Sequence, residues 1–340
     1  MEYLLGTKKD FFEFVNSLNS DDKIGILSHT DLDGLASAVF LEKIFESKNL
    51  KAEFVEFMSY GEIDKFDKDF SKLFVLDFNL DEFPKEFERL RKKGKVFLID
   101  HHPINEELED RKNILKTESR DCSCLAMYSL AKEFFDVEEW SWLVCSGVIA
   151  DYCFVKKENL ELINKFYPDV TEENIWDSVP GELAKKINSA LIYSRPDFTK
   201  VYDLILKKDF ELLEKEHEII EKEISKWEEK FKTDAEFYSE KNLYFWYFNP
   251  SYGITATIAG ILSRKEPDKI FIFASDIKDK NVFVKISSRY QKGDVNLGKL
   301  LKKCIEGFEN ANAGGHFKAS AGIFMKKDLE KFKEKLLLNL

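Results

Sequence analysis

The sequence predicts an α/β protein in which a doubly wound parallel sheet is joined by a long helix to a smaller α+β domain. Short apolar runs alternate with helical patterns through the first half of the chain, which is typical of parallel sheets. A Lys/Glu-rich segment without glycine then indicates a long amphipathic helix, and strands and helices restart after it. We expect a sheet domain at residues 1–200, a helical connector at 201–235 and a second domain at 236–340.

The first half of the chain alternates predicted strands and helices. We expect strands at Lys23–Ser28, Ala52–Phe57, Leu73–Phe78 and Val96–Ile99. We expect helices at Lys9–Leu18, Leu35–Ser47, Asp81–Lys93, Ser123–Phe135 and Trp140–Tyr152. The run LFVLDF is almost continuously apolar, as in a parallel strand buried on both faces. Gly94 should cap the helix before it.

The second half is organised differently. Helical fragments are expected around Glu158–Phe166 and Gly181–Tyr193, ahead of the connector. Beyond the connector we expect strands at Asn242–Phe248, Lys269–Ser275 and Asn281–Ser288. Helices are expected at Ile254–Lys265, Asn296–Glu306 and Asp328–Leu338. This order predicts the small α+β domain.

The composition is that of a soluble protein with a sizeable core. Of the 340 residues 44% are hydrophobic and 34% charged, and this length favours two domains. No apolar run approaches the ~18 residues of a membrane span, and the N-terminus is too charged for a signal peptide. Five cysteines, an odd number, agree with a reducing compartment, so we expect a cytoplasmic protein without a membrane partner. Cys122 and Cys124 lack the second pair that a zinc site needs, and we expect both to be buried.

The net charge of −11 limits the nucleic-acid partners that the chain could bind. Proteins that coat long nucleic acid by neutralising phosphates usually carry a basic excess. Any nucleic-acid substrate should therefore be short, or be held by a local basic patch. The candidates for such a patch are Lys285, Arg289, Lys292, Lys299, Lys302 and Lys303.

Groups that bind metals follow three of the predicted strands. The first strand runs into His29, Asp31 and Asp33, the third ends at Asp77, and the fourth ends at Asp100-His101-His102. Because ligands bind beyond the carboxyl ends of strands in doubly wound sheets, these side chains should lie close together. Imidazole with hard carboxylates suits a transition metal such as manganese better than calcium.

The stretch after the first strand has two interpretations. Alternate residues of an extended tip point the same way, so His29, Asp31 and Asp33 can converge, and Gly34 allows a sharp turn. The alternative is a capped turn in which Asp33 caps the helix and His29 is solvated. His217, within the connector, is expected to be a solvated helix residue.

With Asp151, at the end of an apolar helix, these groups are sufficient for two divalent cations that share a bridging carboxylate. Two such metals clamp the attacking and leaving oxygens of a phosphoryl displacement. The order of the motifs resembles that of the DHH phosphoesterase superfamily. The run from Gly314 to Gly322 resembles the glycine-rich signature of the DHH-associated domain. The resemblance covers most of the chain and is nearest to archaeal RecJ-like and nanoRNase-like exonucleases.

The resemblance implies a role for each motif residue of the first domain. One metal would be held by His29 and Asp31, the second by Asp33, His101 and Asp151, and Asp77 would bridge the two. The catalytic pair would be His102, facing the scissile phosphate as an electrostatic stabiliser or proton donor, and Asp100, orienting a histidine. A plain helix-end cap is the alternative for Asp151.

In the second domain the resemblance implies a substrate-binding surface. Gly314 and Gly315 would let backbone amides approach a phosphate or base, His316 would hydrogen-bond the substrate, and Arg289 would contact the nucleic-acid backbone. The alternative for the glycines is a simple turn. Ala313 and the run Ala319-Ser320-Ala321 depart from the pattern of the family, which leaves the substrate preference open.

The expected function is a two-metal, manganese-type phosphodiesterase that removes nucleotides from an end of short single-stranded RNA or DNA, with Mg²⁺ or Co²⁺ as possible replacements. The alternative within the same chemistry is a phosphatase or diesterase for small nucleotides, such as 3′-phosphoadenosine 5′-phosphate or cyclic dinucleotides. An alternative of another class is a replication-complex scaffold, as in relatives that have lost their ligands. Every expected ligand position here carries His or Asp, which favours an enzyme, and an enzyme that also docks on replication proteins fits as well.

Overall fold

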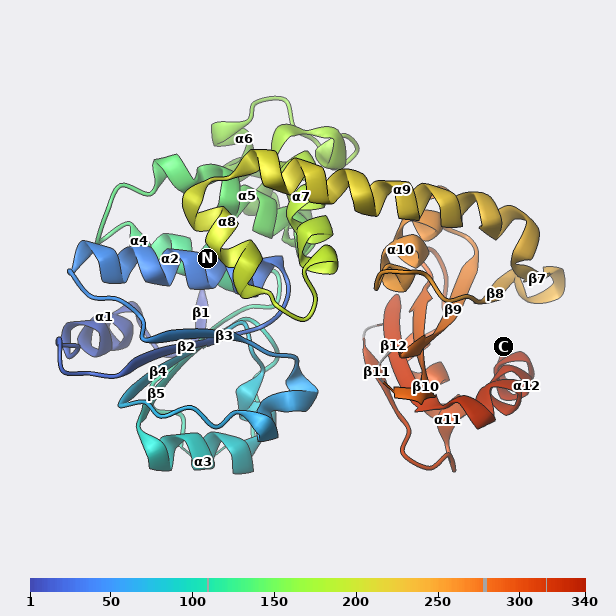
Figure 1. The fold of residues 1–340 in the computed structure, drawn as a ribbon, viewed down its shortest axis with the longest axis horizontal. Helices are drawn as coiled ribbons and strands as arrows, with labels where there is room; N and C mark the ends of the chain where they lie inside the picture. The colour runs from blue at the N-terminus through green and yellow to red at the C-terminus, as the bar shows by residue number, and fades with distance from the viewer. Residues whose placement is uncertain (109, 278–279, 316) are drawn as a thin grey trace. The chain divides into compact units, whose positions relative to one another are not determined.

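The computed structural model describes residues 1–108, 110–277, 280–315 and 317–340, without the side chains of residues 280 and 281. The chain forms two compact units, Met1–His217 and Glu218–Leu340, each built on a six-stranded sheet (Figure 1). Helix α9 (Phe210–Asp234) continues across the boundary between them. In the described part of the chain no helix combines the length and apolarity that a membrane span requires.

The sheet of the first unit is parallel except at one edge. Its strands lie in the order β1-β6-β5-β4-β2-β3, and β1 alone pairs in the antiparallel direction, with β6. Their bounds are β1 (Tyr3–Leu5), β2 (Ile24–Ser28), β3 (Phe54–Phe57), β4 (Lys72–Leu76), β5 (Lys95–Asp100) and β6 (Ile114–Thr117). The four expected strands are confirmed. The sequence did not indicate β1 and β6, which are short and without a clear apolar period.

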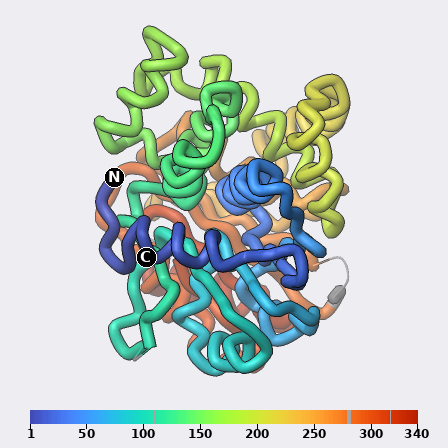
Figure 2. Tube along the Cα trace, turned by 90° about the vertical axis from the view of Figure 1, so that its left-hand side faces the viewer, coloured from blue at the N-terminus to red at the C-terminus, as the bar shows by residue number. Residues whose placement is uncertain are grey.

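Helices cover both faces of this sheet, as a doubly wound fold requires. Successive residues of a strand point to opposite faces, so Ile26 and Phe74 pack towards α2 (Leu32–Ser47), while Leu27 and Val75 pack towards α3 (Pro84–Lys93). Figures 1 and 2 show α3 on one side of the strands and the helical layer on the other. That layer also contains α1 (Lys8–Asn16), α4 (Ser123–Ala131), α5 (Ser141–Ala150), α6 (Lys157–Phe166), α7 (Val179–Tyr193) and α8 (Thr199–Lys207).

Two helix predictions need correction. The helix expected from Leu35 begins at Leu32, one turn earlier, because Asp31 caps it. The expected connector of residues 201–235 is divided between two helices, since Lys208 adopts a left-handed conformation with φ of 54° at the end of α8. Gly94 follows α3 as expected, in an extended conformation.

The second unit has a mostly antiparallel sheet in the order β11-β12-β10-β9-β8-β7, in which only β8 and β9 pair in parallel. The strands are β7 (Glu236–Tyr238), β8 (Leu243–Tyr247), β9 (Ile270–Ile277), β10 (Lys280–Arg289), β11 (Asn312–Gly315) and β12 (Ala319–Met325). The helices are α10 (Thr255–Lys265), α11 (Leu297–Ile305) and α12 (Leu329–Asn339). The expected α+β character of this part is confirmed.

The two faces of the second sheet have different cores. Val284 and Ile286 of β10 pack with α11 and α12 in an aliphatic cluster. On the other face, Phe231 from the second half of α9 lies against Trp246 and Phe273, with ring centroids 5.7 and 5.8 Å away. Aromatic rings therefore cover β8 and β9 on this face.

Candidate metal centre

The strand order creates a switch point at the carboxyl edge of the first sheet. From β2 the chain moves outward to β3, and it then crosses to β4 on the other side of β2. Ligand sites of doubly wound sheets lie at such reversals, beyond the carboxyl ends of the strands. His29 follows β2 and Asp77 follows β4, so the two motifs meet where the topology favours a site.

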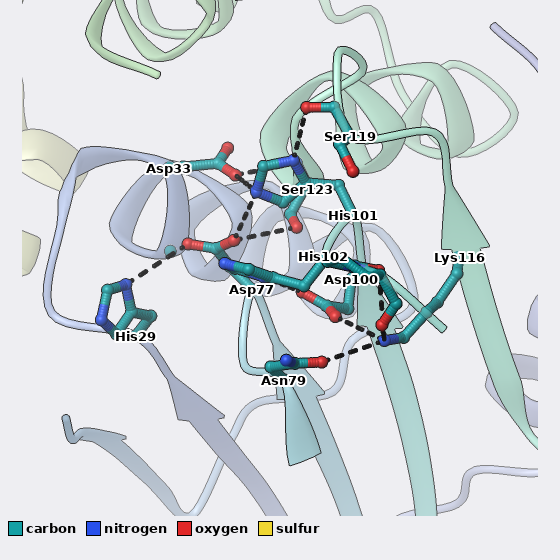
Figure 3. A network of polar contacts seen from close by, with 12 residues as sticks. His29, Asp33, Asp77, Asn79, Asp100, His101, His102, Lys116, Ser119 and Ser123 are labelled. Carbon is teal, nitrogen blue, oxygen red and sulfur yellow. Dashed lines mark hydrogen bonds and ion pairs between the residues drawn. The ribbon is translucent and has the colours of Figure 1, made fainter. Parts of the chain in front are cut away.

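Asp77 lies at the centre of the polar cluster (Figure 3). Its Oδ2 is 3.7 Å from His29 Nδ1 and its Oδ1 is 3.4 Å from His101 Nε2, while Ser123 Oγ donates a hydrogen bond of 3.2 Å to Oδ1. Burial alone would raise its pKa, but the hydrogen bonds from His101 and His29 hold the pKa of Asp77 well below its usual value. The buried carboxylate is therefore charged, with one histidine on each side.

His29 and Asp31 form one flank of the cluster. Asp31 is the N-cap of α2: its Oδ1 accepts from Gly34 N at 3.0 Å, and its Oδ2 lies 2.8 Å from His29 Nδ1. Burial lowers the pKa of His29, but the carboxylates of Asp31 and Asp77 outweigh burial and raise it to about 11. Gly34 is needed for close packing, since a Cβ there would lie 2.6 Å from His29 O.

Asp33 is placed by the first turn of α2, and the expectation of an extended tip with three side chains on one side is wrong. Its carboxylate accepts hydrogen bonds from the backbone amides of Ser123 (2.8 Å) and Cys124 (2.7 Å) at the start of α4. It therefore caps α4 and not its own helix. Its Oδ2 is still 3.9 Å from His101 Nε2. Burial, followed by the carboxylates of Asp77 and Asp151, raises the pKa of Asp33 well above its usual value.

His101 and Asp151 form the other flank. The Nδ1–H of His101 donates to the carbonyl of Ser119 at 3.2 Å, which leaves Nε2 facing Asp77 and, at 3.7 Å, Asp151 Oδ2. A backbone carbonyl in this position fixes the tautomer of a metal-binding histidine. Asp151 ends α5; burial raises its pKa to about 6, although His101 lowers it. Cys153 Sγ donates to Asp151 Oδ2 at 3.3 Å.

His102 belongs to a second line of contacts that leads away from Asp77. Its Nδ1 lies 2.7 Å from Asp100 Oδ1, and Asp100 Oδ2 lies 3.0 Å from Lys116 Nζ (Figure 3). Burial alone would raise the pKa of Asp100, but His102 and Lys116 lower it. Lys116 also donates to Asp81 Oδ1 at 2.6 Å and to the carbonyl of Pro103 at 2.9 Å. It thus fixes both the carboxylate and the loop that carries His102.

Two residues of this region, Lys116 and Tyr60, were not expected from the sequence. Lys116 comes from β6, the strand that was not expected. Tyr60 follows β3; its ring stacks on His29 with centroids 4.4 Å apart, and its hydroxyl lies 3.0 Å from His102 Nε2. The position of Tyr60 after a strand was the available signal, since His29, Asp77 and His101 also follow parallel strands.

The donor groups fit a divalent cation. Within the described residues, two groupings place oxygen and nitrogen donors within 4.8 Å of one another, namely His29 with Asp31 and Asp77, and Asp77 with His101 and His102. In a third, the sulfur of Cys153 lies beside His101 and Asp151. Burial and neighbouring carboxylates raise the pKa values of Asp33 and Asp151, and a bound cation would favour the charged form of both. Carboxylate and imidazole ligands suit Mn²⁺, Zn²⁺ or Mg²⁺.

Two further cysteines lie near the cluster. Cys122 and Cys124 are fully buried, as expected, although they lie close enough to Asp33 to form a fourth grouping. Burial raises the pKa of both thiols well above the usual value. Metals bind thiolates rather than thiols, so the oxygen and nitrogen groupings are the better metal site.

The second unit places three of its four expected site residues. Arg289 pairs with Ala319, and Gly314 pairs with Ala321, so Arg289 and a run of small residues share one face of the sheet. Gly315 has φ of 132°, a conformation that favours glycine. His316 lies outside the described residues.

The expected basic patch is not one surface. Lys285 lies on the Arg289 face by strand register, whereas α11, with Lys299, Lys302 and Lys303, packs on the opposite face. The expectation for His217 is also wrong: this residue is half-buried, and its Nδ1 lies 2.9 Å from the hydroxyl of buried Ser189. It takes no part in the cluster.

Two protein-family models match the chain. The DHH family N-terminal domain matches residues 23–166, and the DHHA1 domain matches residues 240–338. The chain is a DHH-family protein. With the donor groupings at the DHH motifs, it is a metal-dependent phosphoesterase. No curated protein matches the sequence significantly.

Several solved structures share the DHH fold. Exonuclease RecJ bound to manganese superposes with a TM-score of 0.73 at 13% identity, over 97% of this chain and 92% of that chain. CDC45 from Entamoeba histolytica gives a TM-score of 0.66 at 12% identity, over 99% of both chains. An exopolyphosphatase-related protein from Bacteroides fragilis gives 0.57 at 13% identity, over 97% of this chain and 95% of that chain. These likenesses concern the fold.

Proposed function

We propose that the chain is a two-metal, manganese-type phosphodiesterase that removes nucleotides from an end of short single-stranded RNA or DNA. The observation that carries this proposal is the position of Asp77, whose two carboxylate oxygens face His29 and His101 at 3.7 and 3.4 Å. A carboxylate shared by two donor groups is the arrangement that a pair of bridged cations requires. Two bound divalent cations would lower the pKa of a water molecule between them and stabilise charge on a phosphate.

The residues of the first unit have separate tasks in this proposal. His29 and Asp31 hold one cation, and Asp33, His101 and Asp151 hold the other. Carbonyl and amide contacts pre-orient the second group, since His101 is fixed by Ser119 O and Asp33 by two backbone amides of α4. Such outer contacts orient metal ligands.

His102 contacts the scissile phosphate in this proposal. Asp100 accepts the Nδ1 proton of His102, which directs Nε2 away from the buried carboxylate. A ring held in this way stabilises negative charge on the phosphate or delivers a proton to the leaving oxygen. Asp100 acts through His102 and is a positioning residue.

In this proposal the second unit binds the end of the oligonucleotide. Arg289 supplies a cation for the sugar–phosphate backbone, and the neighbouring small residues let the chain of the substrate approach the sheet closely. The net charge of −11 favours short oligonucleotides over long strands, because few phosphates are neutralised. Manganese is preferred because of the mixed imidazole and carboxylate donors, and the RecJ structure with this fold is described as bound to manganese.

The substrate preference is tested by following the hydrolysis of 5′- and 3′-labelled RNA and DNA oligomers in the presence of Mn²⁺. The oligomers are about two to twenty nucleotides long, which spans the usual size of single-strand binding sites. We expect stepwise loss of mononucleotides from one end and faster turnover of the shorter oligomers. 3′-Phosphoadenosine 5′-phosphate and cyclic dinucleotides are tested beside them. If the oligomers stay intact while a small nucleotide is hydrolysed, the exonuclease proposal is wrong and the small-nucleotide alternative replaces it. Absence of turnover on every substrate would favour the scaffold alternative.

A further inference from the structure

Tyr60 contacts two histidines of the polar cluster, His29 and His102. It follows β3, a strand that leads into none of the DHH motifs. It begins the 3-10 helix Tyr60–Lys65 after β3 and is half-buried. Its ring lies nearly parallel to that of His29, with centroids 4.4 Å apart and an interplanar angle of 11°. The ring of Phe78 also packs edge-on against Tyr60, with ring centroids 5.0 Å apart.

The hydroxyl of Tyr60 makes an independent contact. It lies 3.0 Å from His102 Nε2, the ring nitrogen that does not face Asp100. Because the Nδ1 of His102 lies 2.7 Å from a carboxylate oxygen, Nδ1 carries a proton. In the neutral ring Nε2 is then an acceptor, and the phenol donates to it. A continuous line runs from Lys116 through Asp100 and His102 to Tyr60.

We propose that Tyr60 is a positioning residue with two separable roles: its ring fixes the plane of His29, and its hydroxyl fixes the orientation of His102 through Nε2 before the phosphate binds. Resting on the proposed function, this inference adds a residue to the site. Stacked rings orient each other more strictly than burial alone does, so the Tyr60 ring restrains the ring of His29. The Tyr60 hydroxyl is the outer end of the line of contacts that begins at buried Lys116. An arriving phosphate oxygen would take over the place of the phenol at Nε2.

Two substitutions separate the roles. Tyr60→Phe keeps the ring and removes the hydroxyl, whereas Tyr60→Leu removes both. Calorimetric titration with Mn²⁺ should give Tyr60→Phe an affinity within about twofold of the wild type, and Tyr60→Leu an affinity about tenfold lower, in the range of other substitutions behind metal ligands. The matched control is Tyr193→Phe, at an exposed tyrosine of α7, which should leave the Mn²⁺ affinity unchanged.

The hydroxyl has its own readouts. In the metal-free protein, ¹⁵N–¹H spectra of the imidazole side chains should show a shifted Nε2 resonance of His102 in Tyr60→Phe, because the hydrogen bond at Nε2 is lost, while Asp100 keeps the proton on Nδ1 in both proteins. With substrate and Mn²⁺, Tyr60→Phe should lower kcat about tenfold, the effect of one lost hydrogen bond, with little change in KM. A role in folding alone would move the melting temperature and leave the Nε2 resonance unchanged.

Each half of the inference can fail separately. Unchanged Mn²⁺ affinity in folded Tyr60→Leu would overturn the role of the ring. An unchanged Nε2 resonance of His102 in Tyr60→Phe would overturn the role of the hydroxyl. Both measurements work without turnover, so failure of the wild type to cleave any phosphodiester would contradict the proposed function and still leave the inference about Tyr60 open to these two tests.

Discussion

Lys116 Nζ lies 3.0 Å from Asp100 Oδ2, and neither side chain is exposed to solvent. The same ammonium group binds Asp81, so one buried cation neutralises two buried carboxylates. Removal of the cation leaves both charges without a partner in the interior. Lys116→Met should therefore lower the free energy of unfolding of the first unit by about 3–5 kcal/mol. Urea unfolding followed by circular dichroism measures this value.

A control for Lys116 comes from the surface. Lys9 of α1 pairs with Glu13, and its side chain is 82% exposed. Lys9→Met should cost no more than about 1 kcal/mol, since surface ion pairs contribute little. Equal losses in the two variants would contradict the importance of the buried network.

Asp77→Asn should remove activity while keeping the fold. Asn adopts the left-handed region more readily than most residues, so it tolerates the φ of 51° at this position. It is also similar in size to the aspartate and can still accept from Ser123. With the central charge lost, kcat/KM should fall by at least about 100-fold, the upper range for groups that support a metal. Asp67→Asn, at an exposed ion pair with Lys93, is the control and should keep wild-type turnover. Near-normal turnover of Asp77→Asn would refute the shared-ligand proposal.

Divalent cations should stabilise the first unit. A ligand that binds only the folded state at 100 times its Kd stabilises that state by about 2.7 kcal/mol, which corresponds to about 5–10 °C in melting temperature for a unit of this size. Calorimetry with Mn²⁺ should show this upward shift, and a chelator should reverse it. The transition of the second unit should not move. A shift that persists in Asp77→Asn would show that the metal binds elsewhere.

Arg289→Ala should weaken substrate binding more than chemistry. Its strand position places it on the small-residue face of the second unit, so we expect KM for a trinucleotide to rise about tenfold, within the range for a charge-assisted contact, with kcat nearly unchanged. The dependence of KM on salt should also decrease, because one phosphate contact is lost. Lys299→Ala, on α11 over the opposite face, is the matched control. A larger effect of Lys299→Ala would mean that the other face binds the substrate.

Acid should weaken the second unit through Glu223. This side chain is 11% exposed, and its Oε1 accepts from Trp227 Nε1 at 2.9 Å and from Ser251 N at 2.7 Å. Burial alone would raise its pKa, but these hydrogen bonds and Lys226 lower it below the usual value. A carboxylate with a lowered pKa stabilises the folded state above its unfolded pKa of about 4.3, and this contribution is lost as pH falls through the lower folded value.

Tryptophan fluorescence during urea unfolding reports on this contribution. The stability of the second unit should be constant between neutral pH and about 5 and then decline below about 4.3. Glu223→Gln, which can still accept both hydrogen bonds, should flatten the decline by about 1 kcal/mol. Glu229→Gln, on the exposed side of the same helix, should leave the profile as in the wild type. Identical profiles for both variants would exclude Glu223 as the cause.

The parallel sheet was predictable because β2, β4 and β5 are apolar runs followed by polar groups. Periodicity does not reveal β6, whose four residues include Lys116, and without this strand the partner of Asp100 could not be named. The convergence of His29, Asp31 and Asp77 followed from strand ends alone. The position of Asp33 did not, since it depends on the start of α4, a helix about 90 residues away in sequence. Tyr60 lacks the chemistry that marks a metal ligand, and its role depends on stacking that only the folded chain defines.

Helix α9 also decides where the second unit can be separated from the first. The DHHA1 match begins at residue 240, but Trp227 and Phe231 of α9 lie against Trp246, Phe248 and Phe273. A fragment that starts at residue 240 would present a face of bare aromatic rings to water and should self-associate. One that starts at residue 218 keeps the helical cover and should remain monomeric. The matched domain is thus shorter than the compact unit Glu218–Leu340, and the difference contains most of α9 and all of β7.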